Sequence, residues 1–144
     1  MVMEHIFMSV DKIATYDDIH KEVGRIVKAS CEWEKEFKEL LLLLNIKTNV
    51  FSNSGLQRMN KILLKEGYID DYYYKCFRKV IERRNYIVHE YFLESHSFSL
   101  EENEDILNGT YFLINEARDI IANIIDEHNG VSYGKRPTVF DKEN

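Results

Sequence analysis

The sequence predicts an all-α fold, an antiparallel bundle of four to five helices. Apolar residues recur three and four positions apart over long stretches, which is typical of amphipathic helices. No turn signal is flanked by two segments of alternating apolar and polar residues, so no β-hairpin is expected. Six Gly and one Pro among 144 residues are too few to punctuate a β protein with many tight turns. The length fits one domain, expected over residues 1–130, with a tail at 131–144.

The first long helix is expected from Tyr16 to Asn45, where apolar residues such as Ile19, Val23 and Phe37 fall on one stripe. A short helix is expected before it, from Glu4 to Lys12. Five consecutive leucines, Leu40 to Leu44, close the long helix. We expect them to be buried on all sides, with a docking patch for a partner helix as the alternative.

A polar stretch at 49–55 predicts a loop, and the segment from Gly55 to Lys65 predicts a short helix that stops at Gly67. Asp70 or Asp71 then caps a second long helix that runs to about Glu94.

Ser95 to Ser99 is a polar link, and Ser99 with Glu102 forms a capping box that starts the last helix. This helix is expected to stop near Gly130. The tail that follows contains the only Pro and has no periodicity, so we expect it to be mobile.

The composition excludes several classes of protein. Acidic residues outnumber basic ones by 25 to 19, and the net charge of −6 argues against a surface built for indiscriminate nucleic-acid binding. Cys31 and Cys76 lie in apolar, helix-like stretches, which indicates reduced core thiols of a cytoplasmic protein. The longest uncharged run around the leucines, Leu40 to Ile46, falls far short of the roughly 20 residues of a membrane span. No membrane association is expected.

Arg84 is the least expected residue of the second long helix. On a helical wheel it falls in the middle of an apolar stripe, whose members are Tyr73, Phe77, Val80, Ile81, Ile87, Val88 and Tyr91. An arginine there must pair its guanidinium or reach a wet cleft, because an unpaired buried charge is very costly. One alternative is a buried ion pair with a carboxylate of a neighbouring helix.

Polar residues accompany Arg84 along this helix. Asn85 and His89 are four positions apart and share one flank, with Glu82 a turn earlier. In a straight helix Arg84 and His89 point about 140° apart and lie roughly 7.5 Å apart along the axis. A second copy of the helix across a two-fold axis would help them form one cleft, which favours a dimer.

The segment from Glu82 to Phe92 resembles the signature of HEPN domains. These are all-helical bundles with an Arg-x4-6-His motif and often an Asn after the Arg. Leu63 to Asp70 resembles the lead-in of that family, a short helix and a Gly before a long helix. The Arg-x4-His-x-Tyr form is similar to HEPN toxins that pair with a minimal nucleotidyltransferase, although the first helix here is longer and a link at 92–99 is extra.

The resemblance implies a metal-independent endoribonuclease without a cofactor, a toxin or antiphage or stress effector. It would cleave RNA at a homodimer cleft, leaving 2′,3′-cyclic phosphate and 5′-hydroxyl ends. His89 would take the proton of the 2′-hydroxyl or protonate the leaving oxygen, and Arg84 would hold the scissile phosphate. Asn85 would orient His89 or the phosphate by hydrogen bonding. The implied partners are a second copy, RNA, and an antitoxin or nucleotidyltransferase.

Tyr91 has three interpretations: a phenol that lines the site, a hydroxyl that a partner adenylylates, or an interface aromatic with a hydrogen-bonded hydroxyl. Four further cations are candidate RNA contacts: Lys75, Arg78, Lys79 and Arg83. The alternative is a solvated helix face. The histidines lack the spacing of metal ligands, so no metal is expected.

Two other functions remain open at this point. The first is a catalytically silent HEPN-like module for dimerisation or for binding a partner or ligand, because a fold does not guarantee chemistry. The second is an unrelated all-α regulatory bundle in which Arg84 pairs in the core.

Overall fold

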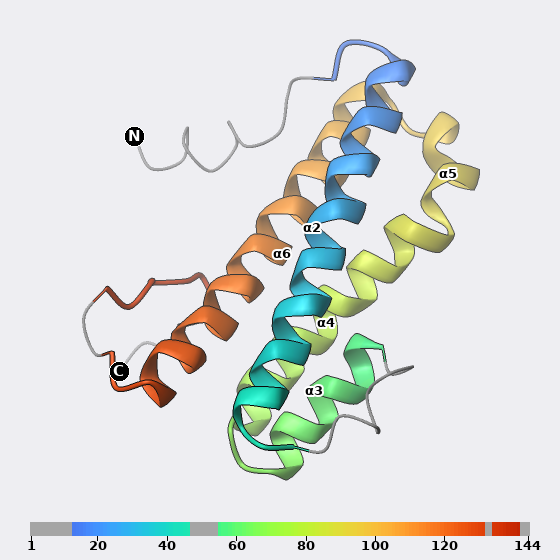
Figure 1. Cartoon of the computed structure of the whole chain (residues 1–144). Coiled ribbons are helices and arrows are strands. Elements are labelled where there is room, and N and C mark those ends of the chain that lie inside the picture. Colours follow the sequence, from blue (N-terminus) through green and yellow to red (C-terminus); the bar gives the residue numbers. More distant parts are fainter. Residues whose placement is uncertain (1–12, 47–54, 132–133, 142–144) are drawn as a thin grey trace.

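The computed structural model describes residues 13–46, 55–131 and 134–141, and its regular elements are all helical (Figure 1). Five α-helices and one 3-10 turn follow one another: α2 (Tyr16–Leu43), α3 (Leu56–Lys65), α4 (Asp71–His89), α5 (Tyr91–Glu94), η2 (Ser95–Ser97) and α6 (Leu100–His128). The all-α prediction is confirmed for this part of the chain. The helix expected at residues 4–12 and most of the loop at 49–55 lie outside the described residues.

The helices begin where the sequence places caps. The Ser99 hydroxyl accepts a hydrogen bond from the Glu102 backbone N–H at 3.0 Å, and the Asp70 carboxylate accepts one from the Tyr73 N–H at 2.9 Å. At α2 the Asp18 carboxylate accepts the backbone N–H groups of Ala14 and Thr15, and these bonds lower the pKa of Asp18. Each cap satisfies donors that a helix start leaves orphaned.

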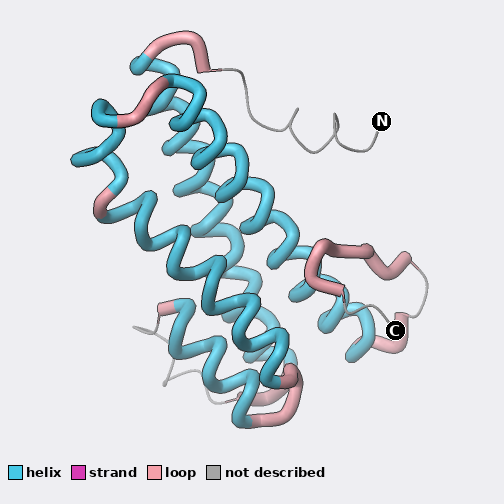
Figure 2. Tube along the Cα trace, turned by 180° about the vertical axis from the view of Figure 1, so that it is seen from behind, coloured by secondary structure: helices cyan, strands magenta, loops and turns pink. Residues whose placement is uncertain are grey.

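The two longest helices, α2 and α6, lie side by side and run in the same direction, while α4 runs opposite to both (Figures 1 and 2). The Tyr16 hydroxyl donates to the Phe98 carbonyl at the start of both helices, and Arg118 pairs with Glu36 further along both. The prediction of a wholly antiparallel bundle is therefore wrong for α2 and α6. Because α4 returns the chain to the end where α2 begins, α6 must follow α2 in its direction.

An aromatic cluster fills the crossing of α2 and α4. Trp33 and Phe37 of α2 pack against Phe77 of α4, with ring centroids 5.6 to 6.1 Å apart, and all three side chains have no exposed surface. Aromatic pairs at this spacing add to the free energy gained from burying their large apolar area. The cluster therefore joins the two helices that carry Arg84 and its contacts.

The run of leucines does not bury all its members. Leu40 and Leu41 are fully buried and Leu44 nearly so, whereas Leu42 is 54% and Leu43 37% exposed. The prediction of burial on all sides is wrong, because α2 buries only the side that faces its neighbours. Cys31 also differs from its prediction as a core thiol: it is exposed on α2, and Cys76 is half-buried.

The second long helix is interrupted at Glu90, whose φ of −124° and ψ of −29° lie outside the helical range. The expected single helix to Glu94 is therefore two helices, α4 and α5. The break changes the direction of every side chain after His89. Tyr91, the first residue of α5, has no exposed surface.

Residues 134–141 of the tail lie against α6, where we expected a mobile segment. Asn123 of α6 bonds the backbone of Arg136, and Phe140 packs against the core. Within the described ranges, no helix has the length and apolarity that crossing a bilayer requires.

Truncation of Phe77 tests the aromatic cluster. We expect Phe77→Ala to lower the free energy of unfolding by about 3–5 kcal/mol, because it leaves a cavity between α2 and α4. Urea denaturation measures the change. Tyr72→Ala on the same helix is the control, since Tyr72 is 38% exposed. An equal loss in both variants would contradict the central role of the cluster.

Candidate functional site

The guanidinium of Arg84 is half-buried and hydrogen-bonded to two neutral side chains. Its Nε donates to the Ser30 hydroxyl of α2 at 2.5 Å, and Nη1 donates to the Asn85 amide oxygen at 2.8 Å. Ser30 is 1% exposed. No carboxylate in the described part of the chain pairs with Arg84, so the predicted alternative of a buried ion pair finds no partner there. These bonds use two of the five N–H donors of the guanidinium and leave the others for a ligand.

His89 is the last residue of α4 and is exposed. In a regular helix it points about 140° away from Arg84, so Arg84 faces α2 while His89 faces solvent. No hydrogen bond joins His89 to Arg84 or Asn85 among the described residues. One copy of the chain therefore brings Arg84 and Asn85 together and leaves His89 apart from them on the surface.

Tyr91 does not line a surface. Its hydroxyl donates to the side-chain oxygen of buried Asn103 on α6, and its ring packs edge-to-face on Tyr86. Burial raises the pKa of Tyr91 to about 12, with smaller contributions from Tyr86 and Tyr16. The hydrogen bond of the third interpretation is present, but it lies inside the chain. Its burial argues against Tyr91 as a site-lining phenol or as a hydroxyl open to modification.

The candidate RNA-contact cations have different surroundings. Lys75 pairs with Asp71 at 2.9 Å, and Arg78 pairs with Glu82 at 3.7 Å, both on the solvent side of α4. Lys79 is exposed. Exposed pairs of this kind contribute little stability and leave both charges accessible to a ligand.

Arg83 is exposed and extends across α6. Its Nε donates to Thr110 Oγ1 at 3.2 Å and its Nη2 to the Ile106 carbonyl at 3.4 Å. Gly109 makes room for it, since a Cβ at that position would lie 2.9 Å from Arg83 Nη2. Arg83 therefore links α4 to α6.

A groove of about 690 Å³ lies between α4, α6 and the tail. Glu82, Lys79 and Arg83 line it from α4, together with Tyr72, Cys76, Val80, Tyr86, Leu113 and Phe140. Arg84, Asn85 and His89 are not part of this lining. The groove therefore contains two of the four predicted RNA contacts, Lys79 and Arg83, but none of the three motif residues.

Two residues that the sequence analysis did not single out organise this region: Ser30 and Asn103. Both are buried polar side chains on helical stripes that are mainly apolar. That pattern is the signal that could have found them, because a polar residue at a core position must have a hydrogen-bond partner. Asn103 also stands one position after the capping box of α6.

Comparison with protein-family models finds no match, and comparisons with curated proteins and with solved structures find none either. In the described part of the chain, no three His, Cys, Asp or Glu side chains form a group that could hold a metal ion. The functional assignment of the candidate site therefore depends on its own residues and their contacts.

Replacement of Ser30 tests the anchoring of Arg84. Ser30→Ala leaves the half-buried Arg84 Nε without its acceptor, and we expect a loss of about 1–3 kcal/mol in the free energy of unfolding. Thermal or urea denaturation measures it. Cys31→Ala, the neighbouring exposed position, is the control and should stay within about 0.5 kcal/mol of the wild type. Equal values for the two variants would show that the bond does not stabilise the fold.

The buried hydroxyl of Tyr91 predicts a pH dependence. Its pKa is raised from 10.0 to about 12 in the folded protein, so its stabilising contribution is complete below the unfolded value and is lost as the pH rises toward the folded value. We expect the stability of the wild type to fall more steeply than that of Tyr91→Phe between these pH values. Urea unfolding across this range measures the slopes, with Tyr68→Phe as an exposed control. Parallel slopes for wild type and Tyr91→Phe would contradict the prediction.

Proposed function

We propose that the protein is a metal-independent endoribonuclease of the HEPN type that acts as a homodimer, as a toxin or an antiphage or stress effector. The observation that supports this most is the end of α4. There Arg84 and Asn85 are hydrogen-bonded to each other, with guanidinium donors left over, and the exposed His89 follows one turn later. These are the residue types that cleavage by the 2′-hydroxyl of RNA needs.

The chemistry requires one proton transfer at each side of the phosphorus. A base takes the proton of the 2′-hydroxyl, the O2′–P bond forms, and the P–O5′ bond breaks as the leaving oxygen gains a proton. A histidine performs either transfer near neutral pH, because its ordinary pKa is about 6.5. Arg84 would bind the phosphate oxygens and stabilise the charge that develops on them, and Asn85 would hold its guanidinium in place.

A second copy of the chain would complete the site. His89 and Arg84 diverge on one helix, so a two-fold axis beside α4 would bring two copies of each residue to one seam. Exposed apolar side chains support this location: Leu93 is 89% and Phe92 44% exposed on α5, directly after His89. Exposed apolar patches of this kind mark protein–protein contacts.

A catalytically silent HEPN-like module for dimerisation or partner binding is the second candidate. The bond from Arg84 to buried Ser30 favours it, because this arginine links α2 to α4 whether or not RNA is present. The two candidates differ in what His89 does, since no bond of His89 within the described residues stabilises the fold.

Cleavage of RNA in the presence of EDTA tests the proposal. We expect the wild-type protein to degrade RNA without divalent metal and His89→Ala to be slower by about 100-fold or more, because it lacks the proton-transfer group. His128→Ala is the control, since His128 is the exposed last-turn histidine of α6. Product ends are read by phosphatase treatment and gel mobility.

Two results would contradict the ribonuclease. One is RNA left intact by wild-type protein that is dimeric by light scattering, which would favour the silent module. The other is equal cleavage by wild type and His89→Ala, which would identify the activity as a contaminant or place it elsewhere in the chain.

A further inference from the structure

The tail segment 134–141 is held on α6 in the way that a bound peptide is held. The Asn123 side chain donates to the Arg136 carbonyl at 2.7 Å and accepts from the Arg136 N–H at 2.9 Å. One amide thus bonds both backbone groups of a single residue. Paired backbone hydrogen bonds of this kind bind an extended chain whatever its side chains are.

Side-chain contacts add sequence preference to this backbone contact. The Arg136 guanidinium contacts Asp126 at 3.0 Å and Asp119 at 3.9 Å. Three residues later the Val139 N–H donates to the Glu116 carboxylate at 3.1 Å. Burial raises the pKa of Glu116 and Asp119, while the Val139 N–H and Arg136 respectively lower them again, so the segment offsets part of the cost of burying these carboxylates.

A single apolar residue anchors the far end. The Thr138 N–H and hydroxyl bond the Asp141 carboxylate, and this turn places Phe140 against the core at the edge of the groove between α4 and α6. Arginine and phenylalanine four positions apart are therefore the two side chains by which the segment is recognised.

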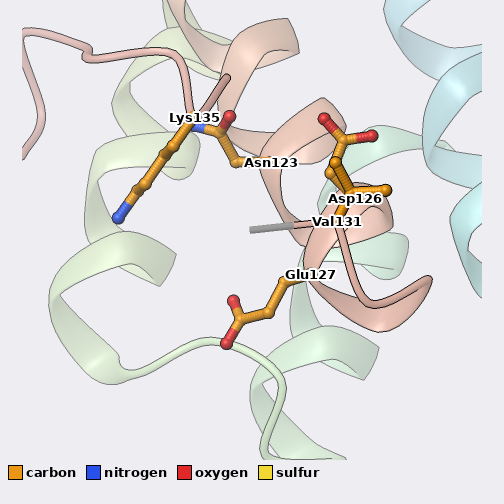
Figure 3. Close-up of a pocket in the computed structure, with 5 residues that line it drawn as sticks. All are labelled: Asn123, Asp126, Glu127, Val131 and Lys135. Atoms are coloured by element: carbon orange, nitrogen blue, oxygen red, sulfur yellow. The ribbon is translucent and has the colours of Figure 1, made fainter. Parts of the chain in front are cut away.

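The segment does not fill the surface on which it lies. A hollow of about 270 Å³ remains beside it, lined by Asn123, Asp126, Glu127, Val131 and Lys135 (Figure 3). The groove of about 690 Å³ that Phe140 borders is open as well. A peptide with larger side chains would gain contacts here that the tail lacks.

We propose that this face of α6 is a docking surface for an extended segment of a partner protein, with an arginine followed four positions later by an aromatic residue. The chain's own tail occupies the surface in cis and is displaced when the partner binds. The contacts that hold the tail on α6 are mainly polar and partly exposed, so replacing the tail with a partner segment costs little free energy. This inference does not depend on the ribonuclease proposal.

Peptide binding to the full chain tests the docking surface. The probe is a fluorescein-labelled peptide with the sequence of residues 134–141, and its anisotropy is measured against wild type and against the double variant Arg136→Ala/Phe140→Ala. We expect saturable binding to the double variant and about tenfold weaker binding to wild type, because a tethered segment competes at an effective concentration in the millimolar range. Adding Asn123→Ala to the double variant should abolish binding, and a scrambled peptide should not bind.

A second measurement uses the wild-type protein alone. Excess unlabelled peptide added to ¹⁵N-labelled protein should shift the amide resonances of Arg136 and Val139 as the tail is released. Equal affinity for wild type and double variant, no binding to the folded double variant, or unmoved tail resonances at millimolar peptide would each overturn the proposal. Binding that survives Asn123→Ala would place the peptide elsewhere and overturn it as well.

Discussion

The side chain of Asn103 holds together the region on which the candidate site depends. It has no exposed surface, accepts the Tyr91 hydroxyl, and donates to the backbone carbonyls of Ser95 and Ser99 at 2.9 and 3.0 Å. Those carbonyls lie in the link between α4 and α6, where each also accepts a backbone N–H, from Phe98 and Asn103 respectively. One amide therefore ties α6 to the chain that follows His89, and an apolar residue there would leave the buried Tyr91 hydroxyl without its acceptor.

Two consecutive arginines fix α4 to different neighbours. Residues one apart on a helix point about 100° apart, so Arg84 reaches Ser30 on α2 while Arg83 reaches Thr110 on α6. Of the two, only Arg84 belongs to the Arg-x4-His motif. Arg83 lies against Gly109, where a Cβ would be too close to its guanidinium. Because α4 is tied on both sides, the orientation of its last turn, and with it the direction of His89, is set by the bundle and not by local flexibility.

Local chemistry made much of the fold predictable from the sequence. Caps at Asp70 and Ser99 and the stop at Gly67 act over a few residues, and the helices begin and end where these signals stand. The break at Glu90 has no such signal in the sequence, and the link that follows it is hydrogen-bonded by Asn103 from a position further along the chain. A regular helix already places Tyr91 on the apolar stripe that contains Arg84, so its burial agrees with the helical pattern, but its partner Asn103 on α6 does not follow from that pattern. The position of the tail could not be predicted either, because Asn123 bonds the backbone groups of Arg136, which no pattern of side chains indicates.

The acidic and basic side chains behind the net charge of −6 lie on different parts of the molecule. Carboxylates of α6 face the tail: Asp119 and Asp126 contact its Arg136, and Glu116 accepts the Val139 N–H. The cations Lys75 and Lys79 are exposed on α4. The acidic excess is thus partly used within the chain, whereas the helix that ends in His89 carries five Lys and Arg residues against two acidic ones. Within the described residues, a polyanion would find net positive charge along α4 and also along α3, which carries Arg58, Lys61 and Lys65 and no acidic residue. Contact along α4 would be weak and sensitive to salt, and it would be strengthened where a second copy placed another α4 beside the first.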